Sequence, residues 1–194
     1  MSWKYSADKR GPKARAAKRA KKLKPGGVAM AGKTAITRRK ASAPLRKLLD
    51  LGLLPAAQLT EMAAGPRPAP WTGATILDYG CGKGTDVEHL QSLGYNAVGW
   101  DPNHRDHHLH LTQNTYDVVL CTYVINCLKP EFEPEILEHI RMLLKPGGVA
   151  FITVRRDLPK GESFGRTYQR HVELDLPIIT RVRKGFITYK LTKE

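Results

Sequence analysis

The sequence predicts an α/β fold: a mostly parallel sheet with a C-terminal antiparallel strand, preceded by a helical and basic N-terminal extension. First, an apolar run at 75–79 passes through closely spaced glycines into a helical pattern at 86–93. Second, a short strand pattern at 97–101 follows and ends in an acid. Third, segments 172–177 and 185–191 alternate or run apolar, which predicts a terminal strand pair that closes the sheet.

Charge divides the chain into two parts. The 194 residues carry a formal net charge of +14, but residues 1–47 hold sixteen Lys and Arg against one acid, and the remainder is nearly neutral. This asymmetry predicts a polyanionic partner, and we expect nucleic acid to contact residues 1–47. A solvated tail that only aids solubility is the alternative. The expected phosphate contacts are Lys13, Arg15, Lys18, Arg19, Lys21, Lys22 and Lys24.

Cysteine usage and hydropathy indicate the compartment. Cys81, Cys121 and Cys127 are odd in number and form no C-x-x-C pair, which fits a reducing environment. No apolar run approaches the length of a transmembrane helix, and the basic N-terminus lacks the apolar stretch of a secretory signal. We therefore expect a cytoplasmic protein without membrane contact, whose oligomeric state the sequence leaves open.

Residues 27–34, GVAMAGKT, match the phosphate-loop pattern G-x-x-x-x-G-K-[ST]. A working loop of this kind links a buried strand to the N-terminus of a helix, so that backbone N–H groups converge on the phosphate. The preceding residues, Lys-Lys-Leu-Lys-Pro, cannot form a buried strand. We interpret the match as coincidental.

A leader follows the arm and is predicted to be helical. An apolar helical face at 44–49, with Pro44 in the first turn, stops at Gly52. A second short helix is expected over about 55–63, and GPRPAP at 65–70 is a stiff connector. The predicted organisation is a basic, disordered arm at 1–32, a helical leader and linker at 33–70, and a ligand-binding domain at 71–194.

The glycine turn at 75–86, TILDYGCGKGTD, has the spacing D-x-G-x-G-x-G with Asp78 at its head. Asp101 ends the next strand, where an acid can accept both ribose hydroxyls of an adenosine cofactor. Dinucleotide and S-adenosylmethionine (SAM) enzymes share these features. Dinucleotide loops read G-x-G-x-x-G and lead a pyrophosphate onto a helix. An acid beside the glycines instead suits SAM, which carries an ammonium and a sulfonium but no phosphate.

At these motifs the chain resembles class I SAM-dependent methyltransferases. The matching segments are DYGCGKG, GWD, YDVVLCTYVIN (116–126) and LLKPGGVAFITVR (143–155). Within this class, the sequence most resembles the methyltransferases associated with DNA phosphorothioation systems. The segments that carry this resemblance are KTAITRRKASAPLRKLLDLGLL, ILDYGCGKGTDVEHL, GYNAVGWDPNH and YVINCL. The resemblance implies a Rossmann-like sheet with SAM as cofactor. Because only fourteen residues separate Asp101 from Tyr116, we expect the sheet to be trimmed at the third strand.

The resemblance also assigns residues to the site. The expected cofactor-binding residues are Asp78, Tyr79, Gly80, Cys81, Gly82, Gly84, Asp101, Pro102, Cys121 and Thr122, with Trp100 or Pro102 beside the adenine. Tyr123 and Asn126 are the expected catalytic residues, although a core role for Tyr123 and helix capping by Asn126 remain alternatives. The next candidates to face the methyl acceptor are Arg155, Arg156 and Asp157. No metal is expected, because His104, His107, His108 and His110 fit no common zinc pattern.

Three functions follow from these observations. The favoured one is SAM-dependent methylation of nucleic acid or a nucleotide-derived acceptor, with the basic arm on phosphates. The alternatives are methylation of a small molecule with an incidental tail, and a non-catalytic module that binds SAM or nucleic acid. The stretch TYVIN lacks the [DNS]-P-P-[YFW] motif of base-amine methylation, and Cys127 lacks the Pro-Cys setting of base C5 methylation.

Overall fold

The computed structural model of the chain describes residues 34–55, 73–106, 110–158, 162–164 and 167–194. The arm at 1–32, with all of its expected phosphate contacts, lies outside these residues. So do most of the helix expected over 55–63 and the connector at 65–70.

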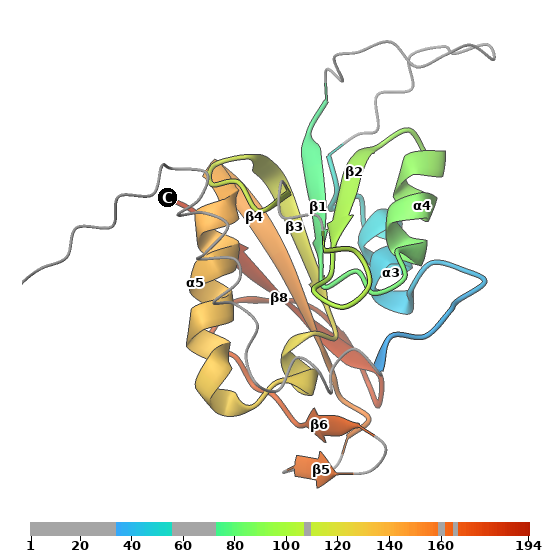
Figure 1. Cartoon of the computed structure of the whole chain (residues 1–194), viewed down its shortest axis with the longest axis vertical. Helices are drawn as coiled ribbons and strands as arrows, with labels where there is room; N and C mark the ends of the chain where they lie inside the picture. Colours follow the sequence, from blue (N-terminus) through green and yellow to red (C-terminus); the bar gives the residue numbers. More distant parts are fainter. Residues whose placement is uncertain (1–33, 56–72, 107–109, 159–161, 165–166) are drawn as a thin grey trace, which may run out of the picture.

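A six-stranded mixed sheet forms the centre of the molecule, in the order β2-β1-β3-β4-β8-β7 (Figure 1). Its first four strands are parallel, and the last two run antiparallel to their neighbours. The parallel strands are β1 (Thr75–Tyr79), β2 (Asn96–Trp100), β3 (Tyr116–Thr122) and β4 (Leu144–Arg155). The antiparallel strands are β7 (Ile178–Val182) and β8 (Phe186–Thr192). The expected fold class is confirmed in its mostly parallel sheet.

Helices cover both faces of the sheet (Figure 1). On one face, α3 (Ala43–Asp50) and α4 (Thr85–Ser92) pack on alternate strand residues such as Ile76, and on the other α5 (Glu133–Leu143) packs on residues such as Leu77. The alternation follows from the two-residue period of a strand. The predicted start of α3 is confirmed, because the Ser42 hydroxyl accepts a hydrogen bond from the Leu45 N–H (3.2 Å).

The edge of the sheet beside β2 is trimmed as expected. Within the described residues β2 is the edge strand, and the chain turns back through an isolated bridge between Asp101 and Arg105. The described helices are too short or too polar to cross a membrane.

The prediction for the terminal strand pair is half wrong. Strand β8 lies where it was expected, but residues 172–177 are irregular, and its partner β7 begins at Ile178. The apolar residues that suggested a strand, Val172 and Leu174, instead fill the core under α5. A small second sheet of β5 (Glu162–Phe164) and β6 (Tyr168–Arg170) was not predicted.

Candidate active site

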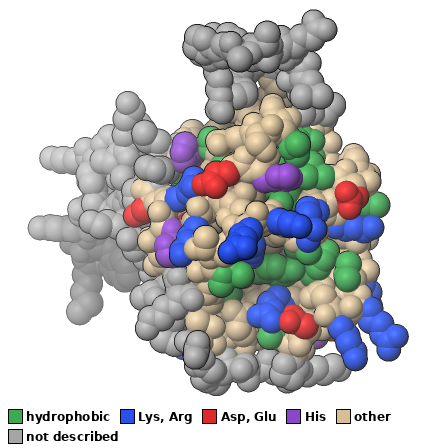
Figure 2. Space-filling view, turned by 90° about the vertical axis from the view of Figure 1, so that its right-hand side faces the viewer, with side chains coloured by type: hydrophobic (Ala, Val, Ile, Leu, Met, Phe, Trp, Pro, Cys, Tyr) green, Lys and Arg blue, Asp and Glu red, His purple; other side chains and the backbone are tan. Residues whose placement is uncertain are grey.

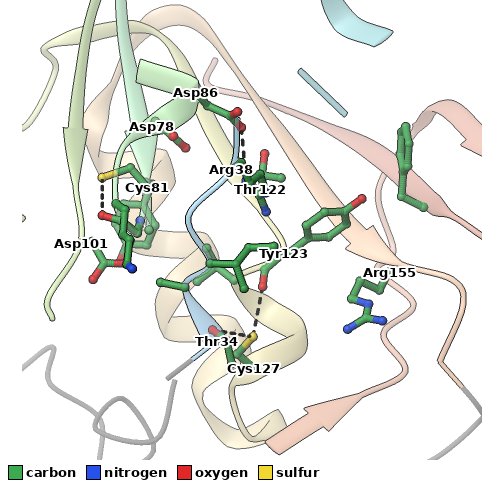
Figure 3. A pocket seen from close by; sticks show the side chains of 18 of the residues that line it. Thr34, Arg38, Asp78, Cys81, Asp86, Asp101, Thr122, Tyr123, Cys127 and Arg155 are labelled. Carbon is green, nitrogen blue, oxygen red and sulfur yellow. Dashed lines mark hydrogen bonds and ion pairs between the residues drawn. The ribbon is translucent and has the colours of Figure 1, made fainter. Parts of the chain in front are cut away.

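A cavity of about 640 Å³ lies at the carboxyl ends of β1, β2, β3 and β4, where open α/β sheets bind ligands (Figure 3). Its two sides differ in chemistry. The glycine half is formed by the glycine turn and the end of β2: Asp78, Tyr79, Gly80, Cys81, Gly82, Lys83, Asp86, Trp100, Asp101, Pro102 and Asn103. The apolar half is formed by residues after β3 and by α5, β6 and the start of β8: Tyr123, Val124, Cys127, Leu128, Ile136, Gln169 and Phe186.

Asp78 is a buried carboxylate at the end of β1, only 3% exposed. Burial, together with the nearby Asp86, raises its pKa to about 8, while Arg38 opposes the shift. Within the described residues no hydrogen bond engages the Asp78 carboxylate. A cationic ligand placed here would restore its ionised form.

Asp101 is held rigidly where β2 ends. Its Oδ2 accepts a hydrogen bond from the Gly82 N–H (3.1 Å), and its Oδ1 accepts from the N–H groups of Asn103 (2.9 Å) and His104 (3.0 Å). Oδ2 therefore still has room for another donor, whereas Oδ1 already accepts two. The neighbouring Trp100 contributes a buried indole N–H that has no partner within the described residues. The glycine half therefore presents both an acceptor and an unused donor.

Gly80 is a position that only glycine fits. Its φ is +76°, and a Cβ built on it would lie 2.4 Å from Cγ2 of Val124. The close approach of Gly80 and Val124 brings the glycine turn against the residues that follow β3. The two halves of the cavity are thereby tied together.

Replacing Gly80 by Ala is expected to destabilise the protein by more than the same change at Gly147. Both glycines have φ +76°, but a Cβ on Gly147 meets nothing within 4 Å. The strain of a left-handed residue, about 1–2 kcal/mol, is common to both variants. Urea unfolding of the two variants isolates the additional clash with Val124, and adding Val124→Ala to Gly80→Ala should recover that difference. Equal losses at the two glycines would contradict the close contact.

Tyr123 follows β3 and lies in the cavity, as expected for a residue that faces a substrate (Figure 3). Its φ is +61°, an unusual value for a residue with a side chain. The Tyr123 N–H donates to the Thr153 carbonyl (2.9 Å), and its carbonyl accepts from the Cys127 thiol (3.2 Å). Burial raises the pKa of Tyr123 to about 12. At neutral pH its hydroxyl is therefore a hydrogen-bond donor and not a base.

Asn126 is not brought to the cavity, contrary to its expected catalytic role. Its side chain is completely buried. The amide donates to the Arg170 carbonyl (2.8 Å) and accepts from the Arg155 N–H (2.9 Å). Both polar ends are thus occupied in joining β4 to β6. Cys121 is likewise placed in the core, away from the cavity, and burial raises the pKa of its thiol.

Gln169 is a cavity residue that the sequence analysis missed. Its Nε2 donates to the Cys127 sulfur (3.1 Å), while its buried Oε1 has no partner within the described residues. Exchanging the two amide atoms would leave the nitrogen unpartnered instead, so one polar end stays free in either orientation. Arg170 fixes the strand that carries Gln169, through bonds to the Leu128 carbonyl (2.7 Å) and to Glu133 (2.5 Å).

The leader crosses the mouth of the cavity, which the sequence analysis did not anticipate. Thr37 accepts a hydrogen bond from the Lys83 ammonium (2.8 Å), and the Ser42 N–H donates to Asp86 (2.7 Å). Arg38 lies 4.0 Å from the other Asp86 oxygen, beside Tyr123 (Figure 3). Residues 34–38 therefore close over the glycine turn, and the leader is part of the site.

The remaining candidates divide between the cavity and its surroundings. Arg155 lines the cavity and forms a two-pronged ion pair with Asp157 (2.9 and 2.6 Å), which holds the pKa of Asp157 below its usual value. Arg156 faces away from it, toward Glu173 and Tyr189. The described residues contain no group of three metal-ligating side chains.

Most of the residues expected to bind a cofactor meet in one place. Those lining the cavity are Asp78, Tyr79, Gly80, Cys81, Gly82, Asp101, Pro102 and Thr122. Gly84 does not line it but starts α4, with its missing Cβ position filled by the Arg105 guanidinium.

Comparisons with known proteins agree with this geometry. A family model described as a methyltransferase domain matches residues 38–178. Among curated proteins, the chain is similar to a ubiquinone biosynthesis O-methyltransferase of Roseobacter denitrificans, with 30% identity over 62% of this chain and 57% of that protein. It is also similar to the mitochondrial ubiquinone biosynthesis O-methyltransferase of Mus musculus, with 26% identity over 75% of this chain and 46% of that protein. The chain thus spans about half the length of these relatives.

A solved structure extends the match to nearly the whole chain. It is the 1,6-didemethyltoxoflavin-N1-methyltransferase of Burkholderia thailandensis with bound 1,6-didemethyltoxoflavin and S-adenosylhomocysteine, with a TM-score of 0.52. The two sequences are 18% identical, and the match covers 97% of this chain and 92% of the other. A likeness of this degree shows a common fold.

Proposed function

The chain belongs to the methyltransferase domain family and takes SAM as its cofactor, and we propose that it methylates an oxygen or nitrogen on a ring-shaped acceptor in the apolar half of the cavity. One observation carries the proposal: apolar walls enclose a space beside the glycine half, and two polar residues also line it. The walls are Val124, Leu128, Ile136 and Phe186, and the polar residues are Tyr123 and Gln169. Such a space suits a flat apolar ring with polar substituents.

The glycine half fits SAM on the chemistry of its donors and acceptors. The buried Asp78 carboxylate, with its pKa near 8, suits the ammonium of the amino-acid part. Asp101 lies where ribose hydroxyls are bound in sheets of this type. The unpartnered Trp100 N–H supplies a donor beside them. These three residues would hold the cofactor against the glycine turn, where Gly80 carries no side chain.

Bound SAM supplies a methyl group made electrophilic by the sulfonium, so the protein needs chiefly to align the acceptor and exclude water. The described residues that line the cavity include no histidine. Tyr123, with a pKa of about 12, stays protonated, and the ion pair with Arg155 makes Asp157 a weak base. The acceptor atom must therefore be nucleophilic without giving a proton to these groups. An ionised ring hydroxyl or a neutral ring nitrogen meets that requirement.

The names of the curated relatives favour oxygen over nitrogen as the acceptor atom, because both describe O-methyl transfer in ubiquinone biosynthesis.

A second candidate function is methylation of nucleic acid. Exposed Arg39, Lys40 and Arg46 lie beside the cavity mouth, and Lys and Arg side chains spread over the face that carries α3 and α4 (Figure 2). Residues 1–32, which lie outside the described residues, carry ten Lys and Arg against one acid.

At saturating SAM, the rate of methyl transfer is expected to rise with pH, with an inflection set by the acceptor and not by the protein. Because no described residue of the apolar half is a good base, and Asp78 is assigned to the cofactor ammonium, only the ionised hydroxyl reacts. The measurement uses labelled SAM with catechol and with the more acidic 4-nitrocatechol, whose inflection should lie at lower pH. A duplex oligonucleotide is assayed in parallel, and transfer to the oligonucleotide alone would favour the second candidate.

Two results would contradict the ring-acceptor mechanism. One inflection common to both catechols would mean that a protein group takes the proton. Binding of SAM in calorimetry without transfer to any of the three acceptors would favour a non-catalytic binding module. Tyr123→Phe serves as the matched variant, since it keeps the ring and is expected to leave the inflection where it is.

A further inference from the structure

A second cavity, of about 610 Å³, lies on the other side of the β7–β8 hairpin from the first. Its floor is apolar and comes from residues such as Leu174 and Ile187. Its rim is strongly basic, with Arg156, Arg181, Arg183 and Lys184 against a single acid, Glu173. The methyl-transfer mechanism uses none of these residues, so the concentration of positive charge needs its own account.

The cations of this second cavity are only partly compensated. Glu173 bonds to Arg156 Nη1 (3.1 Å) and to His171 (3.2 Å), so its charge compensates Arg156 and not the other cations of the rim. Nε of Arg156 is buried and has no partner within the described residues. Arg181, Arg183 and Lys184 lie exposed within four positions of one another, where like charges repel. A bound anion would relieve the repulsion among these cations.

The hairpin places this second cavity next to the first. Val182 and Lys184 line both cavities, so only the hairpin tip separates them. The tip is fixed to the sheet, because the Arg156 N–H donates to the Gly185 carbonyl (2.8 Å) and the Gly185 N–H donates to Val182 (3.0 Å). Lys184 adopts a left-handed conformation with φ +53°, which gives the tip its tight turn. The two cavities therefore share a fixed basic edge at the hairpin tip.

We propose that the second cavity binds a phosphate group of the methyl acceptor, whose ring lies in the first cavity. The acceptor class is then a phosphorylated ring compound, either a free nucleotide or a nucleotide unit of a nucleic acid. Arginine forks and a lysine on a rim suit phosphate, which accepts several charge-assisted hydrogen bonds at once. The assignment of the ring rests on the proposed function, whereas the anion site stands on the second cavity alone.

The test is calorimetric titration of inorganic pyrophosphate into the full chain at about 0.15 M salt, where the screening length is about 8 Å. The cavity variant is Arg181→Gln with Arg183→Gln, and the matched control is Arg39→Gln with Lys40→Gln, which removes the same charge from the leader. All four side chains are exposed, so thermal unfolding should not change. We expect at least tenfold weaker binding in the cavity variant and less than twofold in the control. Equal losses in both variants, or no binding by the wild type, would overturn the anion site.

Competition then identifies the source of the phosphate. Adenosine 5′-monophosphate alone should displace pyrophosphate if the acceptor is a free nucleotide. A dinucleoside monophosphate, with one phosphodiester, should displace it as well if the acceptor is a nucleic acid. Displacement by neither would overturn the link between the anion site and the acceptor. SAM affinity, measured in the same variants, should not change, and its loss would instead question the placement of the cofactor.

Discussion

Replacing Asp78 by Asn is expected to stabilise the ligand-free protein and to weaken SAM binding at least tenfold. The carboxylate is buried, and its pKa in the folded protein is about 8, above the value near 3.9 of an unfolded chain. The folded state therefore keeps a proton that the unfolded chain releases, and stability falls as pH rises from about 4 to about 8. Asn carries no charge and escapes this loss. The gain over the wild type should be small at pH 4.5 and on the order of a few kcal/mol at pH 8.

Urea unfolding at the two pH values measures the gain, and Asp117→Asn is the matched control. Asp117, like Asp78, is an aspartate within a strand of the sheet, but its carboxylate accepts hydrogen bonds from Thr75 and Lys145 (2.7 and 2.8 Å), and its pKa is lowered. Its replacement should therefore destabilise the protein above about pH 4, the opposite sign. A destabilised Asp78→Asn would show that a partner already satisfies the carboxylate.

The same substitution tests the cofactor site. The charged carboxylate is needed to attract the ammonium of SAM, and it is present in the free wild type only toward pH 8. Wild-type affinity should therefore increase as pH rises from about 6 to 8, with release of a proton on binding, and this dependence should vanish in the variant. Calorimetry in two buffers of different ionisation enthalpy detects the proton. Unchanged SAM affinity in Asp78→Asn would remove Asp78 from the cofactor site.

Sequence reasoning located the glycine half because its determinants are local. A strand, a turn and a helix within 75–93, followed by a second strand, already fix the positions of Asp78 and Asp101 at one edge of the sheet. Spacing alone identifies such a unit, since parallel strands present their carboxyl ends together. Tyr123 was placed in the cavity by the same rule, because it follows β3 directly.

The residues of the apolar half are brought together by long-range contacts, which the spacing of residues in the sequence does not reveal. Asn126 follows β3 as Tyr123 does, yet its amide is occupied by backbone groups 29 and 44 residues away. Gln169 lies in a polar stretch with no strand pattern, and only the pairing of β5 with β6 brings it to the cavity. No local signal in the sequence shows that Thr37 of the leader meets Lys83. Residues 172–177 looked like a strand because apolar alternation also occurs where an irregular segment packs on a core.

Replacing Gln169 by Met is expected to maintain or raise the stability of the protein while lowering the rate of methyl transfer at least tenfold. Methionine has a similar length and suits the apolar surroundings, and it removes a buried polar atom that the free protein leaves unsatisfied. The lost hydrogen bond to the Cys127 sulfur is a weak one. If the free end of the amide orients the acceptor, turnover with catechol should fall while SAM affinity stays unchanged.

Asn126→Leu is the matched control, because it also replaces a buried amide by an apolar side chain. Both ends of the Asn126 amide are bonded, so its removal strands the Arg155 N–H and the Arg170 carbonyl, at a cost of about 2 kcal/mol or more. Thermal unfolding should thus move in opposite directions for the two variants. A Gln169→Met protein that is destabilised as much as Asn126→Leu would assign the Gln169 amide to structure. A stable variant with unchanged turnover would leave the acceptor to be oriented by Tyr123.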